Sequence, residues 1–245
     1  MRRVRRGFKC KREVIESLIR EYDNIVSKDY NGNYLEVIYD FEDIAENRLK
    51  NLLWLFYTSQ KSLDAAWRTC KGELYEYAVF KYIQDMIKQD KELEQRFTVL
   101  MGDEALPTYG DQVAIRNWSE IFPDVDILII EKCTGLVKMI ASCKTSLRER
   151  LTETAFWKRE LERQEATRGI KVVFITTDKD NELKKNTNRY MSLHVLDCTF
   201  VTDPQRYKNA IESFKSKYGD KEDFNTLRLK VRFIDDLADF LKELC

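Results

Sequence analysis

Apolar residues recur every three or four positions through the first third of the chain, which is the spacing of one buried helix face. This period predicts a helix around residues 14–25 and a second one over residues 41–57. The Asn-Gly pair at positions 31–32 predicts a tight turn between them. A longer helix is expected over residues 62–88, with Ser62 as its N-cap.

From about Thr98 the period shifts toward two, and short apolar runs follow that are typical of strands. The runs "PDVDILII" (123–130) and "LVKMIASCK" (136–144) are separated by the turn sequence "EKCTG", so we expect a hairpin. Expected after the hairpin are a basic helix from Arg148 to about Arg168, strands over 170–177 and 192–201, and helices over 204–217 and 233–244.

This order of elements predicts the fold class. A hairpin, a crossover helix and two further strands, with helices before and after them, make a mixed sheet that is covered on both faces. We therefore expect an α/β protein, specifically an α/β/α sandwich with a helical N-terminal extension. Residues 1–61 are the expected helical N-terminal subdomain, and residues 62–245 are the expected core.

The composition agrees with a helix-rich globular protein. Charged residues make up 34% of the chain, and only 8 Gly and 3 Pro leave little material for linkers. No apolar run reaches the roughly 18 to 20 residues of a membrane span, and the start lacks the apolar stretch of a signal peptide. We expect a soluble, cytoplasmic protein.

The charge distribution is more informative than the net charge. The 42 Lys and Arg residues balance 42 Asp and Glu residues, so the whole chain shows no electrostatic sign of a nucleic-acid partner. The first segment, "MRRVRRGFKCKR", is nevertheless strongly basic, and basic residues return in the helix that begins at Arg148. The basic start would add sequence-independent affinity for DNA or would be a solvated tail.

Histidine and cysteine exclude several kinds of chemistry. The six cysteines contain no C-x-x-C pair, which argues against a zinc site and a disulfide scaffold, so reduced thiols are expected. His194 is the single histidine, and we expect it to be a structural residue of the strand over 192–201. Catalysis with a Ser-His-Asp or Cys-His arrangement is then disfavoured, and catalysis would depend on carboxylates and lysine.

The hairpin brings such groups together. Alternate residues of a strand face the same way, so Asp124 shares a face with Asp126, and Ser142 shares one with Lys144. Pairing the two strands places the acidic residues opposite residues 141–144. Mg²⁺ favours a few carboxylate oxygens and can activate water for phosphodiester hydrolysis, which Lys144 would assist. The alternative is a surface ion pair.

The arginines that follow favour the functional interpretation. Arg148 and Arg150 open a helix directly after Lys144. Cations at a helix N-terminus are disfavoured by about 0.3 to 1 kcal/mol, and an external anion such as DNA would justify them.

The strings "FPDVDILII" and "IASCKTSLRERLTETAFWKREL" together resemble the active-site core of type II restriction endonucleases of the PD-(D/E)xK superfamily. The resemblance covers roughly residues 72–201 and is closest to the branch with PD, then (S/T)xK and a later helix-borne glutamate, whose members read CCGG- or CCNGG-type sites. It implies that Asp126 binds the metal, with Asp124 as the alternative, and that Lys144 is the motif lysine. Ser142 stands where most of the superfamily has a carboxylate.

One further metal ligand must therefore come from elsewhere. Glu153 and Glu160 lie seven residues apart on nearly the same helix face, and either could supply the oxygen. The spacing most familiar in that branch falls instead on Trp157 or Lys158. Glu76 resembles the glutamate that many of these nucleases place on the first core helix, and its alternative is a solvated helix position.

The residues after Lys144 are the expected DNA contacts. Arg148, Glu149 and Arg150 resemble the Arg-(Asp/Glu)-Arg group with which the family reads guanine-containing sites. Arginine can donate two hydrogen bonds to guanine, and a carboxylate can accept one from cytosine. The alternative role of each arginine is to clamp a phosphate. Thr145 and Ser146 are expected beside them on the DNA.

The resemblance implies a Mg²⁺-dependent, site-specific endodeoxyribonuclease that cuts double-stranded DNA. It also implies a homodimer, because a two-fold protein matches a palindromic target, and a companion DNA methyltransferase. The N-terminal helices would form the dimer contact or embrace the duplex. Three alternatives remain: a repair or junction-resolving nuclease of the same superfamily, a DNA-binding protein with a degenerate active site, and an α/β protein whose surface ion pairs have no role with nucleic acid.

Overall fold

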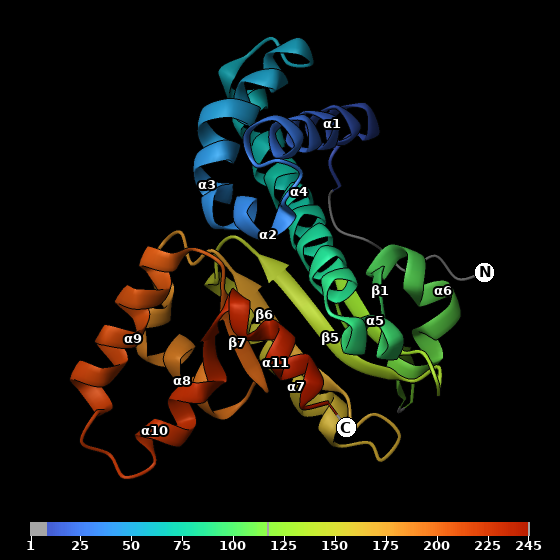
Figure 1. The fold of residues 1–245 in the computed structure, drawn as a ribbon, viewed down its shortest axis with the longest axis vertical. Helices are drawn as coiled ribbons and strands as arrows, with labels where there is room; N and C mark the ends of the chain where they lie inside the picture. The colour runs from blue at the N-terminus through green and yellow to red at the C-terminus, as the bar shows by residue number, and fades with distance from the viewer. Residues whose placement is uncertain (1–8, 117, 245) are drawn as a thin grey trace.

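The computed structural model describes residues 9–116 and 118–244, and it contains one six-stranded mixed sheet with the order β1-β4-β5-β6-β7-β8 (Figure 1). β4 runs antiparallel to both of its neighbours, β1 and β5, whereas β5 to β8 run parallel. A separate two-stranded ribbon pairs β2 with β3. The strands are β1 (Phe97–Met101), β2 (Ile115–Arg116), β3 (Glu120–Ile121), β4 (Ile127–Glu131), β5 (Val137–Lys144), β6 (Lys171–Thr176), β7 (Cys198–Val201) and β8 (Val231–Phe233).

Helices cover both faces of the sheet, as the sequence predicts. Successive residues of β4 enter different cores: Ile127 and Ile129 pack with the N-terminal helices, whereas Leu128 and Ile130 pack on the opposite side. This alternation is the expected result of a strand that is buried on both faces. The helices that follow β1 are α6 (Gly102–Val113), α7 (Arg148–Glu162), η4 (Glu182–Lys184), α8 (Asn186–His194), α9 (Pro204–Tyr218), α10 (Phe224–Leu227), η5 (Arg228–Lys230), η6 (Ile234–Asp236) and α11 (Leu237–Lys242).

The N-terminal helices share one hydrophobic core with the sheet. Figure 1 shows α1 and α3 beside the long helix α4, away from α8, α9 and α10. The ring of Phe41 lies 4.9 Å from that of Tyr75 on α4. No helix in the described part of the chain is both long and apolar enough to cross a membrane. These elements are α1 (Arg12–Asp29), α2 (Tyr34–Val37), η1 (Ile38–Asp40), α3 (Phe41–Asp43), η2 (Ile44–Leu49), η3 (Lys50–Leu55), α4 (Gln60–Gln89) and α5 (Lys91–Arg96).

Two details of these helices differ from the prediction. The second helix, expected over residues 41–57, is a short α-helix followed by a π-helical turn and a 3-10 segment. The N-cap of α4 is Ser59, whose hydroxyl accepts a hydrogen bond from the backbone of Ser62, so Ser62 is not the cap. Two serines three residues apart both suit a helix start, and periodicity alone does not separate them.

The hairpin of β4 and β5 forms in the predicted register. Ile127 pairs with Ala141, and the ladder shifts by one residue after Ile129. The predicted strand over 123–130 begins later, at Ile127, so Asp124 precedes it. The backbone N–H of Asp126 still donates to the carbonyl of Ala141, which keeps this carboxylate in the hairpin geometry.

The segment before β4 is held from its other side by α6. The backbone N–H of Gly102 donates to the carbonyl oxygen of Asp126 over 2.8 Å. A Cβ atom at Gly102 would lie 1.9 Å from the carbonyl oxygen of Val125, which is far inside van der Waals contact. Only glycine lets the start of α6 approach so closely.

The predicted strand over 192–201 is wrong in its first half. Residues 186–194 form α8, and only Cys198–Val201 form β7. His194 is therefore an exposed residue at the end of a helix and not part of a strand. Because β6 and β7 are parallel, the chain must cross back over the sheet between them, and a helix is the usual crossover.

The basic helix expected from Arg148 and the C-terminal helix expected over 233–244 are both shorter than predicted. α7 ends at Glu162 and not near Arg168, because residues 163–169 form turns. The helix expected over 233–244 is preceded by the edge strand β8 and begins at Leu237. A strand of three residues gives too short an alternation to be seen in the sequence.

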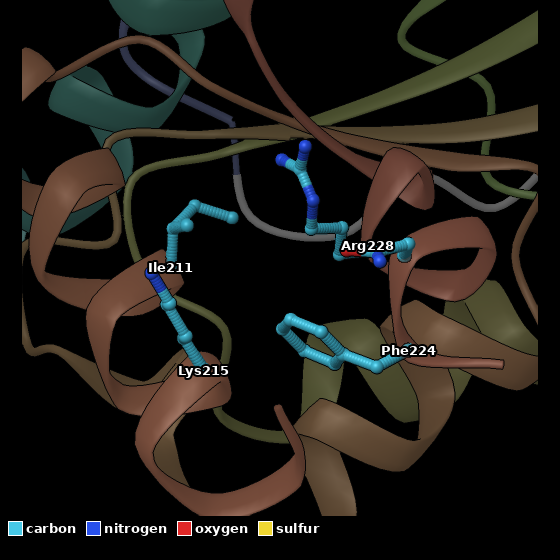
Figure 2. Close-up of a pocket in the computed structure, with 5 residues that line it drawn as sticks. Ile211, Lys215, Phe224 and Arg228 are labelled. Atoms are coloured by element: carbon cyan, nitrogen blue, oxygen red, sulfur yellow. The ribbon is translucent and has the colours of Figure 1, made fainter. Parts of the chain in front are cut away.

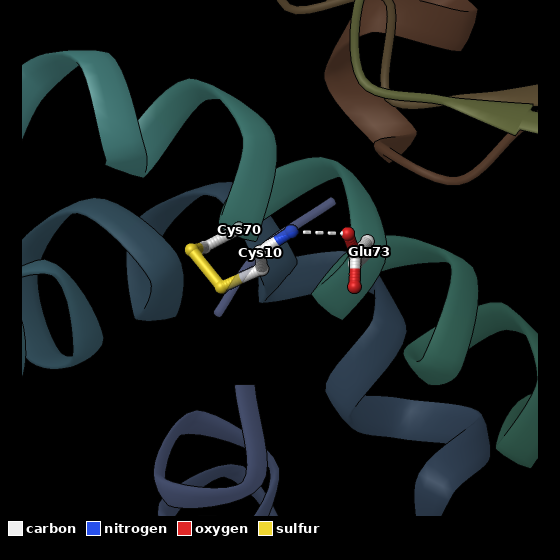
Figure 3. The surroundings of a disulfide bond; sticks show 3 residues. All are labelled: Cys10, Cys70 and Glu73. Carbon is white, nitrogen blue, oxygen red and sulfur yellow. Dashed lines mark hydrogen bonds between the residues drawn. A yellow bond between two sulfur atoms is a disulfide. The ribbon is translucent and has the colours of Figure 1, made fainter. Parts of the chain in front are cut away.

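A disulfide corrects the expectation of reduced thiols. Cys10 and Cys70 are bonded, with their Cα atoms 4.7 Å apart, and Figure 3 shows Glu73 beside them. The backbone N–H of Cys10 donates to the carboxylate of Glu73 over 2.5 Å. The two cysteines are 60 residues apart and meet only because the start of the chain packs on α4, which no local spacing reveals. Cys133, Cys143 and Cys198 are free thiols, and Cys245 lies outside the described residues.

Candidate active site

A lysine surrounded by three carboxylates lies where the sequence predicts it. The ammonium nitrogen Nζ of Lys144, at the end of β5, is 2.7 Å and 2.9 Å from the two carboxylate oxygens of Asp126. It is 2.9 Å from Oε1 of Glu76 on α4 and 3.8 Å from Oδ2 of Asp124. The predicted meeting of the acidic pair and the lysine is confirmed, and α4 adds a third carboxylate.

Backbone contacts hold Asp126 in this position. Its Oδ2 accepts a hydrogen bond of 2.6 Å from the backbone N–H of Cys143, and its carbonyl is held by Gly102. The residue is only 7% exposed, whereas the side chain of Asp124 is 45% exposed. Asp126 is therefore the fixed carboxylate of the pair, and Asp124 lies at the opening.

Burial and mutual repulsion shape the protonation of the cluster. Burial raises the pKa of Asp126 despite its contact with the ammonium of Lys144. Burial, and then the negative charge of Asp126, raise the pKa of Glu76 to about 8. Burial lowers the pKa of Lys144, but the facing carboxylates of Asp126 and Glu76 outweigh it and raise this pKa overall. Three carboxylates thus face one ammonium, and the fully ionised cluster carries excess negative charge.

The cluster opens into a cleft of about 900 Å³. Its walls come from α4, from the segment before β4, from the loop after β5 and from α7. Pattern analysis alone missed Tyr77 and Trp157, which also line the cleft. The resemblance expects a glutamate of the active site at Trp157 or Lys158. This spacing could have indicated that Trp157 lies at the cleft.

The two helix-borne glutamates have different places. Glu153 lines the cleft, and its carboxylate pairs with Arg150 over 3.1 Å. Glu160 pairs with Arg163 over 2.9 Å and is not among the residues that line the cleft. Of the candidate third ligands, Glu76 is the one in direct contact with Lys144. Metal-binding roles for all three glutamates remain predictions.

Three of the five expected DNA-contacting residues line the cleft. Thr145 and Ser146 are partly buried and line it, and Arg150 is exposed and lines it as well. Glu149 is exposed in the first turn of α7. Arg148 begins α7, but its side chain lies outside the described part of the structure, as do the basic residues 1–8.

The chemistry of the donors decides which metal ion the cluster would suit. In the described residues, no three His, Cys, Asp or Glu side chains are arranged so that they could hold a metal ion as they stand. The carboxylates of Asp126, Glu76 and Asp124 instead surround an ammonium. Oxygen-only donors with excess negative charge suit a hard divalent cation that keeps part of its water shell. The residues present therefore fit Mg²⁺ better than a soft metal.

A second, smaller cavity does not compete with this cleft. It measures about 330 Å³ and lies between α9, α10 and η5 (Figure 2). Its lining contains two cationic side chains and no carboxylate, thiol or imidazole, so it offers neither a nucleophile nor a general base. The lining residues are Ile211, Lys215, Phe224, Asn225 and Arg228.

Comparisons with known proteins point in one direction. A sequence model of the family described as BsaWI restriction endonuclease type 2 matches residues 105–226. This span includes Asp124, Asp126, Lys144 and all of α7, but not Glu76.

Two relatives carry similar descriptions. A protein of Methanocaldococcus jannaschii described as the type II restriction enzyme MjaVIP is 30% identical over 152 residues, which cover 58% of this chain and 67% of the relative. A protein of Helicobacter pylori described as the type II restriction enzyme HpyAORF263P is 40% identical over 63 residues, which cover 26% of this chain and 33% of the relative.

A solved structure shares the fold. The restriction endonuclease PspGI in complex with its substrate DNA superimposes with a TM-score of 0.58 and 17% sequence identity. The match covers 95% of this chain and 91% of the other chain, so it includes the N-terminal helices as well as the sheet.

Proposed function

Because the chain belongs to the type II restriction endonuclease family, we propose that it hydrolyses phosphodiester bonds of double-stranded DNA at a defined sequence with Mg²⁺ as its cofactor. As a member of that family it is a sequence-specific DNA-cleaving nuclease. The observation that supports the chemistry is the ammonium of Lys144 within 4 Å of three carboxylates at the base of an open cleft.

The proposed roles follow from the position of each group. Asp126 is the principal metal ligand because two backbone contacts fix it, and Glu76 and Asp124 supply further oxygens. When bound, Mg²⁺ would lower the pKa of a coordinated water and offset the charge that develops on the phosphate. The ammonium of Lys144 donates hydrogen bonds to oxygen acceptors, so it would orient the attacking water and offset phosphate charge.

We propose that α7 reads the DNA next to this site. Its first residues follow Lys144 by only a short loop, and Arg150 reaches the cleft. Arg148 and Arg150 would donate to guanine or to phosphates, and Glu149 would accept from cytosine. Thr145 and Ser146 would contact the backbone, because they lie between the catalytic lysine and the recognition residues. Glu153 holds Arg150 and is therefore proposed as an orienting residue.

The proposed assembly is a homodimer whose two clefts face the two strands of a palindromic site. A companion methyltransferase would protect the host DNA. Light scattering of the free protein and of its complex with a cleavable duplex measures the stoichiometry: two chains for each duplex support the proposal, and one chain for each duplex contradicts it.

The decisive experiment is digestion of an unmethylated genome with Mg²⁺, followed by sequencing of the fragment ends. A single short motif at every end is the expected result. Fragments without a common motif would favour a repair or junction-resolving nuclease that acts on DNA shape. Replacing Mg²⁺ with Ca²⁺ or adding a chelator should abolish cutting, and cutting in the chelator would contradict the metal-dependent mechanism.

One observation favours a second candidate, a DNA-binding protein without activity. Ser142 is buried at the position where most of the superfamily has a carboxylate. The carboxylate of Glu76 restores a third acidic group at the cluster, which is why we prefer the enzyme. Slow migration of DNA in a gel without any cleavage in Mg²⁺ would reverse this preference.

A further inference from the structure

A second lysine between carboxylates lies on α4, the helix that also carries Glu76. The ammonium of Lys71 on α4 is 2.5 Å from Oε2 of Glu42 and 2.6 Å from Oε1 of Glu46. Both glutamates belong to the N-terminal helices, and Glu46 also accepts a hydrogen bond from the indole N–H of Trp67. The side chain of Lys71 is only 4% exposed, whereas those of Glu42 and Glu46 are 22% and 42% exposed, and Lys71 is not among the residues that line the cleft of Lys144.

Only one of these glutamates reaches beyond the N-terminal helices. Oε1 of Glu42 accepts a hydrogen bond of 2.7 Å from the hydroxyl of Thr177, which follows β6. The same hydroxyl is 2.9 Å from the backbone carbonyl of Thr145. Glu46 contacts Lys71, Lys50 and Trp67 but not this loop.

The buried hydroxyl of Thr177 connects the carboxylate of Glu42 with the carbonyl of Thr145. Thr177 is 1% exposed, so water cannot easily replace its partners. A hydroxyl has one hydrogen to donate, and a carboxylate is the stronger acceptor. The hydroxyl donates toward both Glu42 and the carbonyl of Thr145, so its one hydrogen is shared and both acceptors are tied to the same buried oxygen.

The loop that contains Thr145 connects the two halves of the proposed active site. Thr145 directly follows Lys144, and both line the cleft with Ser146. α7 starts two residues after Ser146. Lys144 is also paired with Thr176 in the sheet, the residue before Thr177. Thr177 thus directly follows the strand partner of Lys144, and its contact Thr145 directly follows Lys144 itself.

We propose that Glu42 and Thr177 are positioning residues that hold the loop of residues 145–147, so that the N-terminal helices set the geometry between Lys144 and the start of α7. This inference rests on the proposed nuclease function of the cleft. A displacement of about 1 Å at a reacting group can reduce a rate about 100-fold, so the loop needs such a support. Buried ion pairs add little net stability, which leaves placement as the role that explains this cluster.

The test compares four variants that differ in single atoms or charges. Thr177→Val keeps the shape but removes the hydroxyl, and Thr177→Ser restores the hydroxyl. Glu42→Gln weakens the acceptor of Thr177, and Glu46→Gln is the matched control because Glu46 contacts the same lysine without reaching the loop. Single-turnover cleavage of the natural site is measured in Mg²⁺, with DNA affinity in Ca²⁺ measured separately.

Thr177→Val and Glu42→Gln should slow cleavage about tenfold or more while DNA affinity changes less than threefold. Thr177→Ser and Glu46→Gln should remain within about threefold of the natural rate. Thr177→Val that cuts at the natural rate, or Glu46→Gln that is as slow as Glu42→Gln, would overturn the inference, because the cluster would then act only through the stability of the fold.

Hydrogen exchange separates a failure of this inference from a failure of the proposed function. The amides of residues 147–151 should exchange faster in Thr177→Val and Glu42→Gln, and at the natural rate in Glu46→Gln. This measurement needs no DNA cleavage. A protein that never cuts DNA but shows this exchange pattern keeps the positioning role and loses the nuclease assignment, whereas unchanged exchange in all variants removes the positioning role.

Discussion

Helix α4 contributes to two lysine–carboxylate clusters: it supplies the glutamate Glu76 to one and the lysine Lys71 to the other. Glu76 joins Lys144, Asp126 and Asp124 at a cleft, whereas Lys71 is enclosed by Glu42 and Glu46 inside the protein. The open cluster has three carboxylates for one ammonium and can accept a cation. The Lys71 cluster has two, and one of them, Glu42, accepts a hydrogen bond from the hydroxyl of Thr177, which follows β6. Access from the cleft and charge balance, not residue type, separate a candidate reaction centre from a support.

The largest expected difference is in cleavage. Lys144→Ala should reduce the single-turnover rate by about 100- to 10,000-fold, because it removes the group that orients water and offsets phosphate charge. DNA affinity in Ca²⁺ should remain. The matched control is Lys138→Ala, which removes a lysine from the same strand, β5, whose ion pair is with Glu131 and not with the cluster. A near-natural rate in Lys144→Ala would place the chemistry elsewhere.

The Lys71 cluster should respond in stability. Lys71→Met leaves the carboxylate of Glu42 without its cation and leaves that of Glu46 with the more distant Lys50, so we expect the free energy of unfolding in urea to fall by about 3 kcal/mol. This is the lower end of the usual cost, because both glutamates keep some exposure. Lys50→Met, which removes a more exposed lysine from the same helices, should cost less than about 1 kcal/mol. Equal losses in the two variants would contradict the difference in burial.

A buried carboxylate without a lysine sharpens the comparison. Burial raises the pKa of Asp178 to about 6, although its side chain accepts hydrogen bonds from the backbone of Glu182 and Leu183. The folded state therefore holds a proton that the unfolded state releases near pH 4, and this group lowers stability as the pH rises from about 4 to about 6. Asp178→Asn removes this dependence.

The measurement is urea unfolding of Asp178→Asn and the natural protein at pH 4 and pH 7. We expect the variant to gain about 2 kcal/mol relative to the natural protein between these two values. A difference that is independent of pH would show that folding does not change the pKa of Asp178.

The smallest expected effect is a change in the Mg²⁺ concentration that cleavage requires. Glu76→Gln should raise the Mg²⁺ concentration for half-maximal cleavage about tenfold, because it removes a carboxyl that can ionise to bind the metal while Asp126 stays in place. Asp85→Asn is the control on the same helix, outside the residues that line the cleft. An unchanged requirement in Glu76→Gln would assign the third ligand to another carboxylate, and Glu153 is the candidate that lines the cleft.

Much of the fold follows from pattern, and its failures have a common cause. The hairpin register was predictable because a shift by one residue would turn apolar side chains out of the cores. The division of residues 192–201 was not, because Leu193 and Leu196 fit both a helix and a strand until the parallel pairing of β6 and β7 demands a crossover. The edge strand β8 forms only because β7 offers it a partner.

The candidate site divides in the same way. Asp124 and Asp126 directly precede β4, and Lys144 ends the neighbouring strand β5, so alternation and pairing predict their meeting. Glu76 could be placed only by resemblance, because its approach depends on how α4 packs across the sheet. The Cys10–Cys70 bond and the Glu42–Thr177 contact join segments 60 and 135 residues apart, and no local period encodes them.

The missing side chain at position 102 gives a simple criterion for sorting natural homologues. Any larger residue there must push the start of α6 away from the carbonyl of Val125, and with it loosen the neighbouring backbone that carries Asp126. Homologues that keep glycine at this position can share the tight placement of the aspartate, whereas those with alanine or serine must have rebuilt the helix start. One letter in an alignment thus separates chains with this geometry from chains that have lost it.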